Sequence, residues 1–412
     1  MEQRQWPILA LFCLLHVLVF TLVFTSGAPD VEGYYRYATR ITEGQIPYRD
    51  FSVEYPPGSL LVFLLPRLFT SSLEAYGQAF AVEMLVFDLI SLLGAVRLGQ
   101  RLGQSQWKTA LVYTLAMLSI GPTMVQRYDL APAALTLLAI LFFCQKHYNI
   151  AWAFLAIGTM TKLYPAALAP VFLIYQLKHH GNRHIIAQLA VFASVILIMA
   201  VPFLAIGGDG FIEAFSVQGG RLLQVESTYA SVLLLGQMMG LGTAHVYLGR
   251  FSFDVASPLS ESLADYSFIV TAVSLLTVYI LFWHREGKPK GSGDSDTAYL
   301  VNFSILVICV LLITLKVFSP QFIIWLLPLV AIINGRRRQT LWIVFIAVGL
   351  LTYCIYPMHY SELVNMQPAA IIALFVRNLL VIVMAILLAL EGQGKTNPPK
   401  TPPEIRQMPS TY

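Results

Sequence analysis

The chain has 412 residues, of which 57% are hydrophobic and only 12% are charged, and its mean hydropathy is +0.69. The charged fraction is about half of that in ordinary soluble domains, so the composition excludes a soluble globular protein and predicts an all-α polytopic membrane protein. The net charge of +4 comes from basic residues that punctuate the hydrophobic runs, so it indicates no nucleic-acid partner.

The first apolar run, residues 8–24, is long enough to cross a hydrocarbon core of about 30 Å as a helix. Ser26 and Ala28 follow it and fit the small-x-small pattern of a signal-peptide cleavage site. The run of 17 residues exceeds the usual hydrophobic region of a signal peptide, about 7 to 15 residues. We therefore expect it to be retained as a membrane anchor.

A polar loop, residues 26–73, follows this span and combines carboxylates with aromatic side chains, which suits sugar binding. A sugar hydroxyl that attacks an anomeric carbon needs a carboxylate to accept its proton, and Asp30 or Glu32 is placed for this role just beyond the first helix. Asp30 has an alternative interpretation as the N-cap of a helix that begins at Val31. For Glu32 we favour an ion pair with Arg36, four residues further on.

The sequence YPPG at residues 55–58 is expected to turn this loop back into the bilayer, because a residue before proline favours an extended conformation. At least half of the tyrosines in the loop are expected to belong to an interfacial aromatic belt and to contact no sugar.

Apolar runs along the chain predict twelve membrane spans in all. They lie near 6–25, 74–97, 107–125, 129–146, 149–161, 163–177, 185–206, 263–284, 299–317, 320–334, 340–357 and 368–389. If the N-terminus is cytoplasmic, 16 of the 26 Lys and Arg residues fall on the inner side, as the positive-inside rule requires. The prediction is a multi-pass protein of the plasma (inner) membrane with both termini cytoplasmic and with extracytoplasmic loops at 26–73 and 207–262.

Residues 1–391 are expected to form a single integral membrane domain. Within it, residues 284–297 are rich in Gly, Ser and charge and are expected to be a flexible cytoplasmic linker. The proline-rich tail, residues 392–412, is expected to be a disordered cytoplasmic segment.

Some segments do not fit simple crossings. The spans 149–161 and 163–177 are too short to cross straight, and broken helices of this kind are tolerated where they line a cavity inside the protein. We expect 228–242 to be a re-entrant or interfacial helix and 245–258 to be an extracytoplasmic strand pair.

Polar clusters converge on the predicted outer side, which favours a site there because scattered polar residues would divide between both faces. They are the first loop, Gln126–Asp129, Lys162–Pro165, Arg221–Glu226 and Lys316–Trp325. A lipid-linked phosphate needs cations at head-group depth, and the candidates are Lys162, Arg221 and Lys316, with Arg377 as a further one.

These residues also have structural interpretations that the sequence leaves open. Lys162 would snorkel to lipid phosphates if it were only an anchor. Arg127 and Asp129 would pair with each other if they formed only a clamp. Glu83 and Asp88 lie inside the second span, either as packed hydrogen-bonding groups or as functional ones.

The ordered series DVEGYYRYA, GQIPYRDFSVEYPPG, QRYD, KLYP, GGRLLQVES and KVFSPQFIIWLLP resembles the polyprenyl-phosphate-sugar-dependent membrane glycosyltransferases of the GT-C superfamily, most nearly the family 87 mannosyltransferases. The resemblance extends over most of the chain. It implies a GT-C-like fold of about twelve transmembrane helices, whose extracytoplasmic loops carry short helices.

The resemblance also implies an activity. It implies inverting transfer of a hexose, often mannose, from a polyprenyl-phosphate donor to a lipid or glycan acceptor on the extracytoplasmic side. Asp30 matches the family's catalytic base, and no cofactor or metal is implied, although Asp30 with Glu32 leaves a metal role open. A secondary transporter or lipid flippase is the alternative, but no internal repeat is visible.

The predicted site therefore has three groups of residues. Asp30 is the catalytic base, and Lys162, Arg221 and Lys316 bind the donor phosphate. The expected substrate-binding residues are Glu54, Tyr55, Arg127, Asp129, Tyr164, Glu226, Gln321 and His359. His359 is weighed as an acceptor-positioning or proton-relay residue, and neither it nor His245 has the spacing of a metal ligand.

Overall fold

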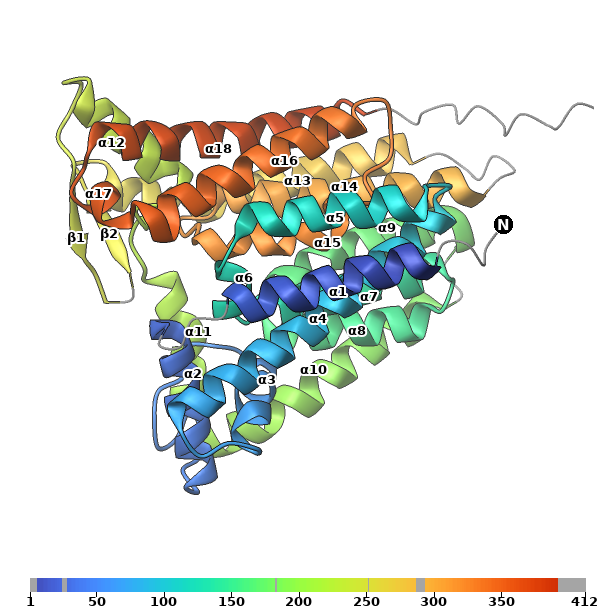
Figure 1. The fold of residues 1–412 in the computed structure, drawn as a ribbon, viewed down its shortest axis with the longest axis horizontal. Helices are drawn as coiled ribbons and strands as arrows, with labels where there is room; N and C mark the ends of the chain where they lie inside the picture. Colours follow the sequence, from blue (N-terminus) through green and yellow to red (C-terminus); the bar gives the residue numbers. More distant parts are fainter. Residues whose placement is uncertain (1–5, 24–27, 182–183, 251, 287–292, 392–412) are drawn as a thin grey trace, which may run out of the picture.

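The computed structural model describes residues 6–23, 28–181, 184–250, 252–286 and 293–391. These residues form a predominantly helical protein with one two-stranded hairpin (Figure 1). The predicted tail, 392–412, lies outside them.

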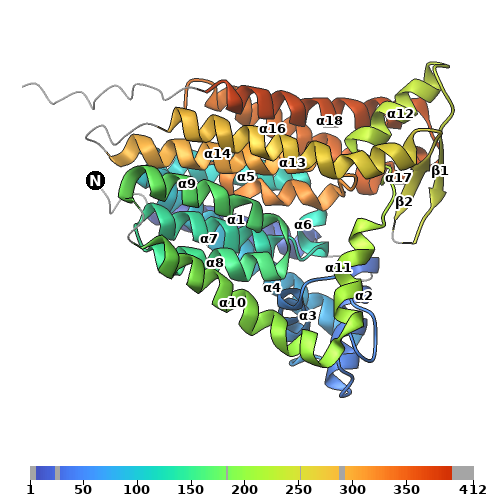
Figure 2. The same cartoon turned by 180° about the vertical axis from the view of Figure 1, so that it is seen from behind.

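Long helices lie alongside one another and form the body of the protein, and the view from behind shows the same bundle (Figures 1 and 2). They are α1 (Trp6–Val23), α4 (Leu73–Arg101), α5 (Gln106–Ile120), α7 (Leu130–Cys144), α8 (Tyr148–Thr161), α9 (Ala169–His180), α10 (Ile185–Gly207), α13 (Ser260–Arg285), α14 (Gly293–Thr314), α16 (Arg338–Tyr353) and α18 (Pro368–Ala389).

The helices differ in how much of their apolar surface the protein covers. In α14, 83% of the most apolar stretch is buried, whereas in α10 none of it is, although α10 has the higher mean hydropathy of 2.8. A helix that is apolar all round and uncovered by protein needs an apolar environment, since large exposed apolar surfaces are rare in soluble proteins. The bundle is therefore a membrane domain with α14 at its centre and α10 at its lipid-facing edge.

Among the described residues, six helices are long and apolar enough to cross a membrane: α4, α10, α13, α14, α16 and α18. The other predicted spans are shorter helices or are interrupted. The span predicted at 320–334 is a 3₁₀ turn, η3 (Pro320–Trp325), followed by the short α15 (Leu327–Val330). The total of twelve crossings thus stays a prediction.

The two short spans predicted on either side of Lys162 are a broken pair in the structure. Helix α8 ends at Thr161, Lys162 adopts an extended conformation, and a 3₁₀ turn, η2 (Tyr164–Leu168), leads into α9. A second break separates α5 from the one-turn α6 (Thr123–Gln126), which α7 follows. Both breaks hold predicted site residues.

One end of the bundle carries the shorter elements (Figures 1 and 2). They are α2 (Pro29–Thr42), α3 (Pro57–Arg67), α11 (Asp209–Gly219), α12 (Thr228–Met238), β1 (His245–Leu248), β2 (Phe253–Ala256), the π-turn η4 (Cys354–Met358) and α17 (Tyr360–Val364). The antiparallel pairing of β1 with β2 confirms the strand pair expected at 245–258. The segment 228–242 contains α12, which packs against α18.

The linker expected at 284–297 is shorter than predicted. Helix α13 continues to Arg285 and α14 already begins at Gly293, so only residues 287–292, which lie outside the described residues, separate the two helices beyond Glu286. The glycines and charges of this segment are typical of a flexible linker, but acidic residues are also favourable in the first turn of a helix.

Candidate active site

Asp30 lies in the first turn of α2, an amphipathic helix beyond the end of α1. Pro29 begins this helix and the first turn contains two carboxylates, both favourable at a helix N-terminus. Val31, Tyr34 and Ala38 are buried at helical spacing, so α2 packs against the bundle through one face. The N-cap is Ala28 and no side chain caps the helix, so the alternative interpretation of Asp30 as an N-cap is wrong.

The Asp30 carboxylate forms an ion pair with Arg127, the residue after α6. A second nitrogen of this guanidinium, Nη2, donates a hydrogen bond of 2.8 Å to the hydroxyl of Tyr356. The guanidinium also lies over the ring of Tyr356. The side chain of Asp30 is 27% exposed and that of Arg127 is 12% exposed. The carboxylate is thus held on one side and accessible on another.

Burial raises the pKa of Asp30, and the nearby Asp129 carboxylate raises it further. The charges of Arg127 and Lys162 oppose this rise without cancelling it. A carboxylate with a raised pKa is a stronger base than an ordinary Asp and remains ionised near neutral pH if the rise is moderate.

A second ion pair lies beside the first. The Lys162 ammonium donates to Asp129 Oδ1 at 2.5 Å, and the same oxygen accepts a hydrogen bond of 2.7 Å from the Trp325 indole. Lys162 also lies over the rings of Tyr128, Phe322 and Trp325, at 4.7, 4.9 and 5.4 Å from their centroids. Such an aromatic cage stabilises a cation by cation–π attraction.

These contacts decide between the alternatives left open by the sequence. Arg127 pairs with Asp30 and not with Asp129, so the clamp between Arg127 and Asp129 is wrong. The side chain of Lys162 is only 15% exposed and paired inside the protein, so it does not snorkel to lipid. Glu32 pairs with Arg36 at 3.2 Å on the exposed face of α2, as expected.

Three polar atoms around the Lys162 cage are buried and have no partner within the described part of the chain: Asp129 Oδ2, the Tyr128 hydroxyl and Gln321 Oε1. A buried polar group without a hydrogen bond is costly, typically about 1 to 3 kcal/mol, and rare in folded proteins. Their concentration beside a caged cation indicates a place that a polar ligand or water completes.

Aromatic side chains form the wall behind both pairs. Tyr164 stacks on Trp325 with ring centroids 4.2 Å apart, and its hydroxyl bonds to Thr136 at 3.0 Å. Tyr55 packs edge-on against Tyr128 at 5.4 Å. Burial raises the pKa of Tyr55, so its hydroxyl stays protonated.

Gly58 explains why the first loop returns to the bundle where it does. A Cβ at this position would lie 2.5 Å from the carbonyl oxygen of Met160 and 2.9 Å from the nitrogen of Thr161. The start of α3 therefore touches the last turn of α8, directly before Lys162. This confirms that YPPG has a structural role, and Pro56 and Pro57 are the N-cap and first residue of α3.

Arg221 and Lys316, the other two predicted phosphate ligands, are neighbours of each other. Arg221 donates a hydrogen bond of 2.9 Å to Ser252 and lies near Glu54, whose pKa is raised by burial and lowered by Arg221. The Asp30 carboxylate also raises the pKa of Glu54. Lys316 donates to the Gly219 carbonyl at 2.5 Å and has Arg221 as a charged neighbour. Of the three predicted phosphate ligands, Lys162 is the one whose charge lowers the pKa of Asp30.

Glu226 and His359 differ in their surroundings. The Glu226 residue is 2% exposed, and the charges of Arg377 and Arg127 lower the pKa of its carboxyl. His359 is exposed, and a ring nitrogen lies 2.9 Å from the Cys354 carbonyl oxygen.

The polar residues in the second span lie inside the bundle. Asp88 bonds to His16 of α1 and, at 2.9 Å, to the Tyr113 hydroxyl of α5. Glu83 is also buried, with Oε2 unpartnered among the described residues. Asp88 is therefore a packed hydrogen-bonding group that joins three helices.

Metal binding was weighed for Asp30 and Glu32. Their side chains have different partners, Arg127 and Arg36, and within the described ranges no three His, Cys, Asp or Glu side chains gather as a ligand set. The four cysteines are free. The absence of a metal requirement stays a prediction.

Sequence reasoning missed Tyr356, and it included Tyr128 only as a member of the Gln126–Asp129 cluster. Both lie near predicted residues along the chain, Tyr128 within QRYD and Tyr356 three residues before His359. An aromatic residue in an apolar run gives no signal that separates a site residue from an interfacial one. The proximity of Tyr128 to two charged neighbours was the one available sign.

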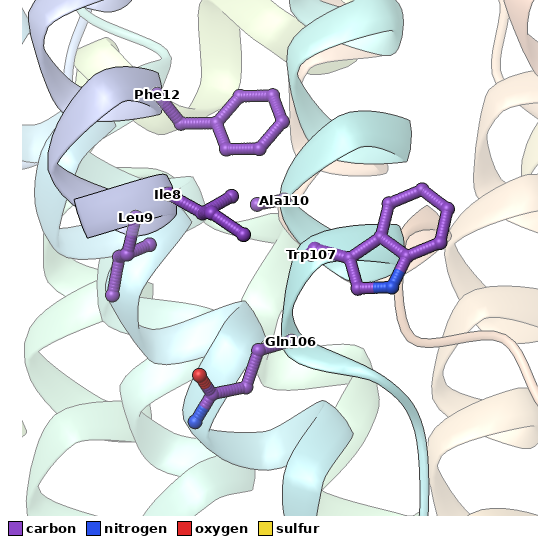
Figure 3. A pocket seen from close by; sticks show the side chains of 6 residues that line it. All are labelled: Ile8, Leu9, Phe12, Gln106, Trp107 and Ala110. Carbon is purple, nitrogen blue, oxygen red and sulfur yellow. The ribbon is translucent and has the colours of Figure 1, made fainter. Parts of the chain in front are cut away.

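A small pocket between α1 and α5 lies elsewhere, and the close view in Figure 3 shows that its lining is apolar except for Gln106. Its lining residues are Ile8, Leu9, Phe12, Gln106, Trp107 and Ala110. None of them belongs to the predicted site.

Comparison with known proteins gives one family. The model of "Glycosyltransferase family 87" matches residues 53–314, more than half of the chain. Asp30, Lys316, Gln321 and His359 lie outside the matched residues. A search of curated proteins finds no match.

Solved structures of similar architecture were also found. The apo oligosaccharyltransferase of Archaeoglobus fulgidus has 13% identity and a TM-score of 0.45, over 93% of this chain and 56% of that one. ArnT from Cupriavidus metallidurans has 12% identity and a TM-score of 0.41, over 94% of this chain and 77% of that one. The chain spans about half the length of the oligosaccharyltransferase chains.

Proposed function

Since the chain belongs to glycosyltransferase family 87, we propose that it transfers a hexose, mannose first among the candidates, from a polyprenyl-phosphate donor to a lipid or glycan acceptor with inversion at the anomeric carbon. The transfer takes place on the extracytoplasmic side of the plasma (inner) membrane. Membrane lipids surround the enzyme, and no nucleic acid takes part.

The observation that supports this proposal most is the pairing of Asp30 with Arg127 beside the caged Lys162. The reaction needs a base that accepts the proton of the acceptor hydroxyl and cations that stabilise the leaving phosphate. The acceptor oxygen attacks the anomeric carbon on the face opposite the phosphate, its proton passes to Asp30, and the bond from the anomeric carbon to the phosphate oxygen breaks. The electron pair of that bond leaves with the lipid phosphate as a dianion, which fixed cations stabilise.

We assign the donor phosphate to Lys162, with Arg221 and Lys316 as its further ligands. Lys162 is already paired with Asp129, so a phosphate would share the ammonium with that carboxylate. Arg suits bidentate phosphate contact and Lys a point-charge contact. Glu54, Tyr55, Tyr164 and Gln321 remain proposed contacts of the sugar and acceptor, as does His359.

The test is transfer by the purified protein. Polyprenyl-phosphate mannose, glucose and arabinose, each radiolabelled in the sugar, are incubated with membrane lipid extracts, and the label in the product is measured. We expect transfer from the mannosyl donor. Label that appears in no acceptor from any of the three donors contradicts the donor class.

A matched pair of variants tests the base. Asp30→Asn keeps the shape of the side chain and should lower turnover by a factor of about 10² or more. Glu32→Gln is the control, because Glu32 lies two residues away on the exposed face of the same helix. Turnover of Asp30→Asn within about threefold of the wild type removes Asp30 from this role.

A further inference from the structure

Glu226 lies where three elements meet behind the candidate site. Its backbone carbonyl accepts hydrogen bonds from Arg377 at 2.7 Å and Asn378 at 3.3 Å, both on α18. The hydroxyl of Tyr360, the first residue of α17, lies near its carboxyl, and each of the two groups affects the other's pKa. The residue is 2% exposed, and its Oε2 is a buried atom without a partner in the described part of the chain.

Tyr360 connects this carboxyl to the catalytic pair. Its ring packs edge-on against the ring of Tyr356, with centroids 5.2 Å apart and planes at 87°. Tyr356 is the residue whose hydroxyl accepts the hydrogen bond from Arg127, which pairs with Asp30. A continuous series of contacts therefore runs from Glu226 through two tyrosines to Arg127.

We propose that Glu226 and Tyr360 are positioning residues that hold Tyr356, and through it the Arg127 side chain, in the orientation that Asp30 requires. The inference rests on the proposed function, because it assumes that Asp30 is the base. It assigns Glu226 to a role behind the site and not to contact with the sugar. The exposure supports this, since the Asp30 side chain is 27% exposed and Glu226 only 2%.

The charge of Glu226 is part of this role. Burial raises the pKa of Glu226 to about 7, against the opposing effects of its own backbone N–H, Arg377, Tyr360 and Arg127. Arg221 is a further charged neighbour. The ionised carboxylate accepts strongly from the Tyr360 hydroxyl, whereas the protonated form is a weaker acceptor. Positioning is therefore strongest above this pKa and weakens as the pH falls through it.

Two variants test the proposal, with turnover and KM measured across about pH 5 to 9. Glu226→Gln keeps the size of the side chain and removes the charge, and Tyr360→Phe keeps the ring and removes the hydroxyl. Each should lower kcat by about 10- to 100-fold at high pH, because a small displacement of a catalytic group has an effect of this size. KM should change by less than about threefold.

The pH profile separates positioning from a purely structural role. The ratio of wild-type to Glu226→Gln activity should fall as the pH drops through about 7, because the wild-type carboxyl then becomes neutral like the amide. Glu362→Gln is the control, since Glu362 is exposed on the same short helix as Tyr360. A ratio that is constant across this range, or kcat of both variants within about threefold of the wild type, overturns the proposal.

Asp30→Asn measured in the same preparation keeps the two hypotheses apart. If Asp30→Asn is active, the proposed base is wrong. If Asp30→Asn is inactive while Glu226→Gln and Tyr360→Phe behave as the wild type, only the positioning role is wrong. Should Glu226→Gln fail to fold, Tyr360→Phe decides, because it removes a single oxygen and leaves the aromatic packing in place.

Discussion

Replacing Arg127 with Met removes the cation that pairs with Asp30 and leaves an unbranched side chain in its place. Burial has the largest effect on the pKa of Asp30 and raises it. Among the charges that lower this pKa, Arg127 has the largest effect, ahead of Lys162. A cation at this range lowers the pKa of a carboxyl by about one to three units, so its loss should raise the pKa of Asp30 by a similar amount.

The sign of the effect on activity follows from the role of Asp30. A general base works in its ionised form, so activity is lost as the pH falls through its pKa. In Arg127→Met this loss should begin at a pH about one to three units higher than in the wild type. On the acidic side of the profile, each unit corresponds to about a tenfold lower kcat/KM.

The assay is the pH dependence of kcat/KM for donor transfer, which reports the free enzyme's ionisations. Arg36→Met is the control, because Arg36 pairs with Glu32 on the exposed face of α2 and should leave the profile unchanged. Arg127→Lys keeps the charge and should lie between the wild type and Arg127→Met. An acidic limb at the same pH in Arg127→Met and in the wild type would refute the coupling between Arg127 and Asp30.

Three further outcomes are expected. Gly58→Ala should lower the free energy of unfolding by about 1 to 3 kcal/mol, measured as a lower Tm, because the added Cβ would lie 2.5 Å from the Met160 carbonyl oxygen. Gly236→Ala is the control and should leave Tm unchanged, because a Cβ at that position has no atom within 4 Å. Lys162→Met should raise KM for the donor by about tenfold or more, because a charge-assisted contact is lost. Lys108→Met is the control and should leave KM unchanged. A KM of Lys162→Met equal to that of the wild type would exclude Lys162 from phosphate binding. Activity should survive EDTA followed by gel filtration, since fixed cations can stabilise the leaving phosphate; a loss restored by Mg²⁺ or Mn²⁺ would show a metal requirement.

The sequence by itself determined the class of protein and the residues worth attention. Apolar runs long enough to span a bilayer identify membrane helices, because the hydrocarbon core requires every backbone polar group to be paired within the segment. In such a chain, charged residues at span ends stand out, and Asp30, Arg127, Asp129 and Lys162 were all found in this way. The alternation of residues 245–258 was likewise sufficient to predict the strand pair.

Boundaries and breaks were predictable only in part. The break at Lys162 was visible as two apolar runs too short to cross. The early start of α14 at Gly293 was not, because glycine and serine in that segment are poor helix formers.

Only the tertiary structure decided which charges meet. Sequence reasoning relates residues a few positions apart, and the clamp between Arg127 and Asp129 rested only on their closeness along the chain. The fold instead joins Asp30 to Arg127 and Asp129 to Lys162, and it brings Tyr356 to Arg127 from 229 residues away. Contacts over such distances depend on how helices pack, and packing depends on the shapes of all the buried side chains together.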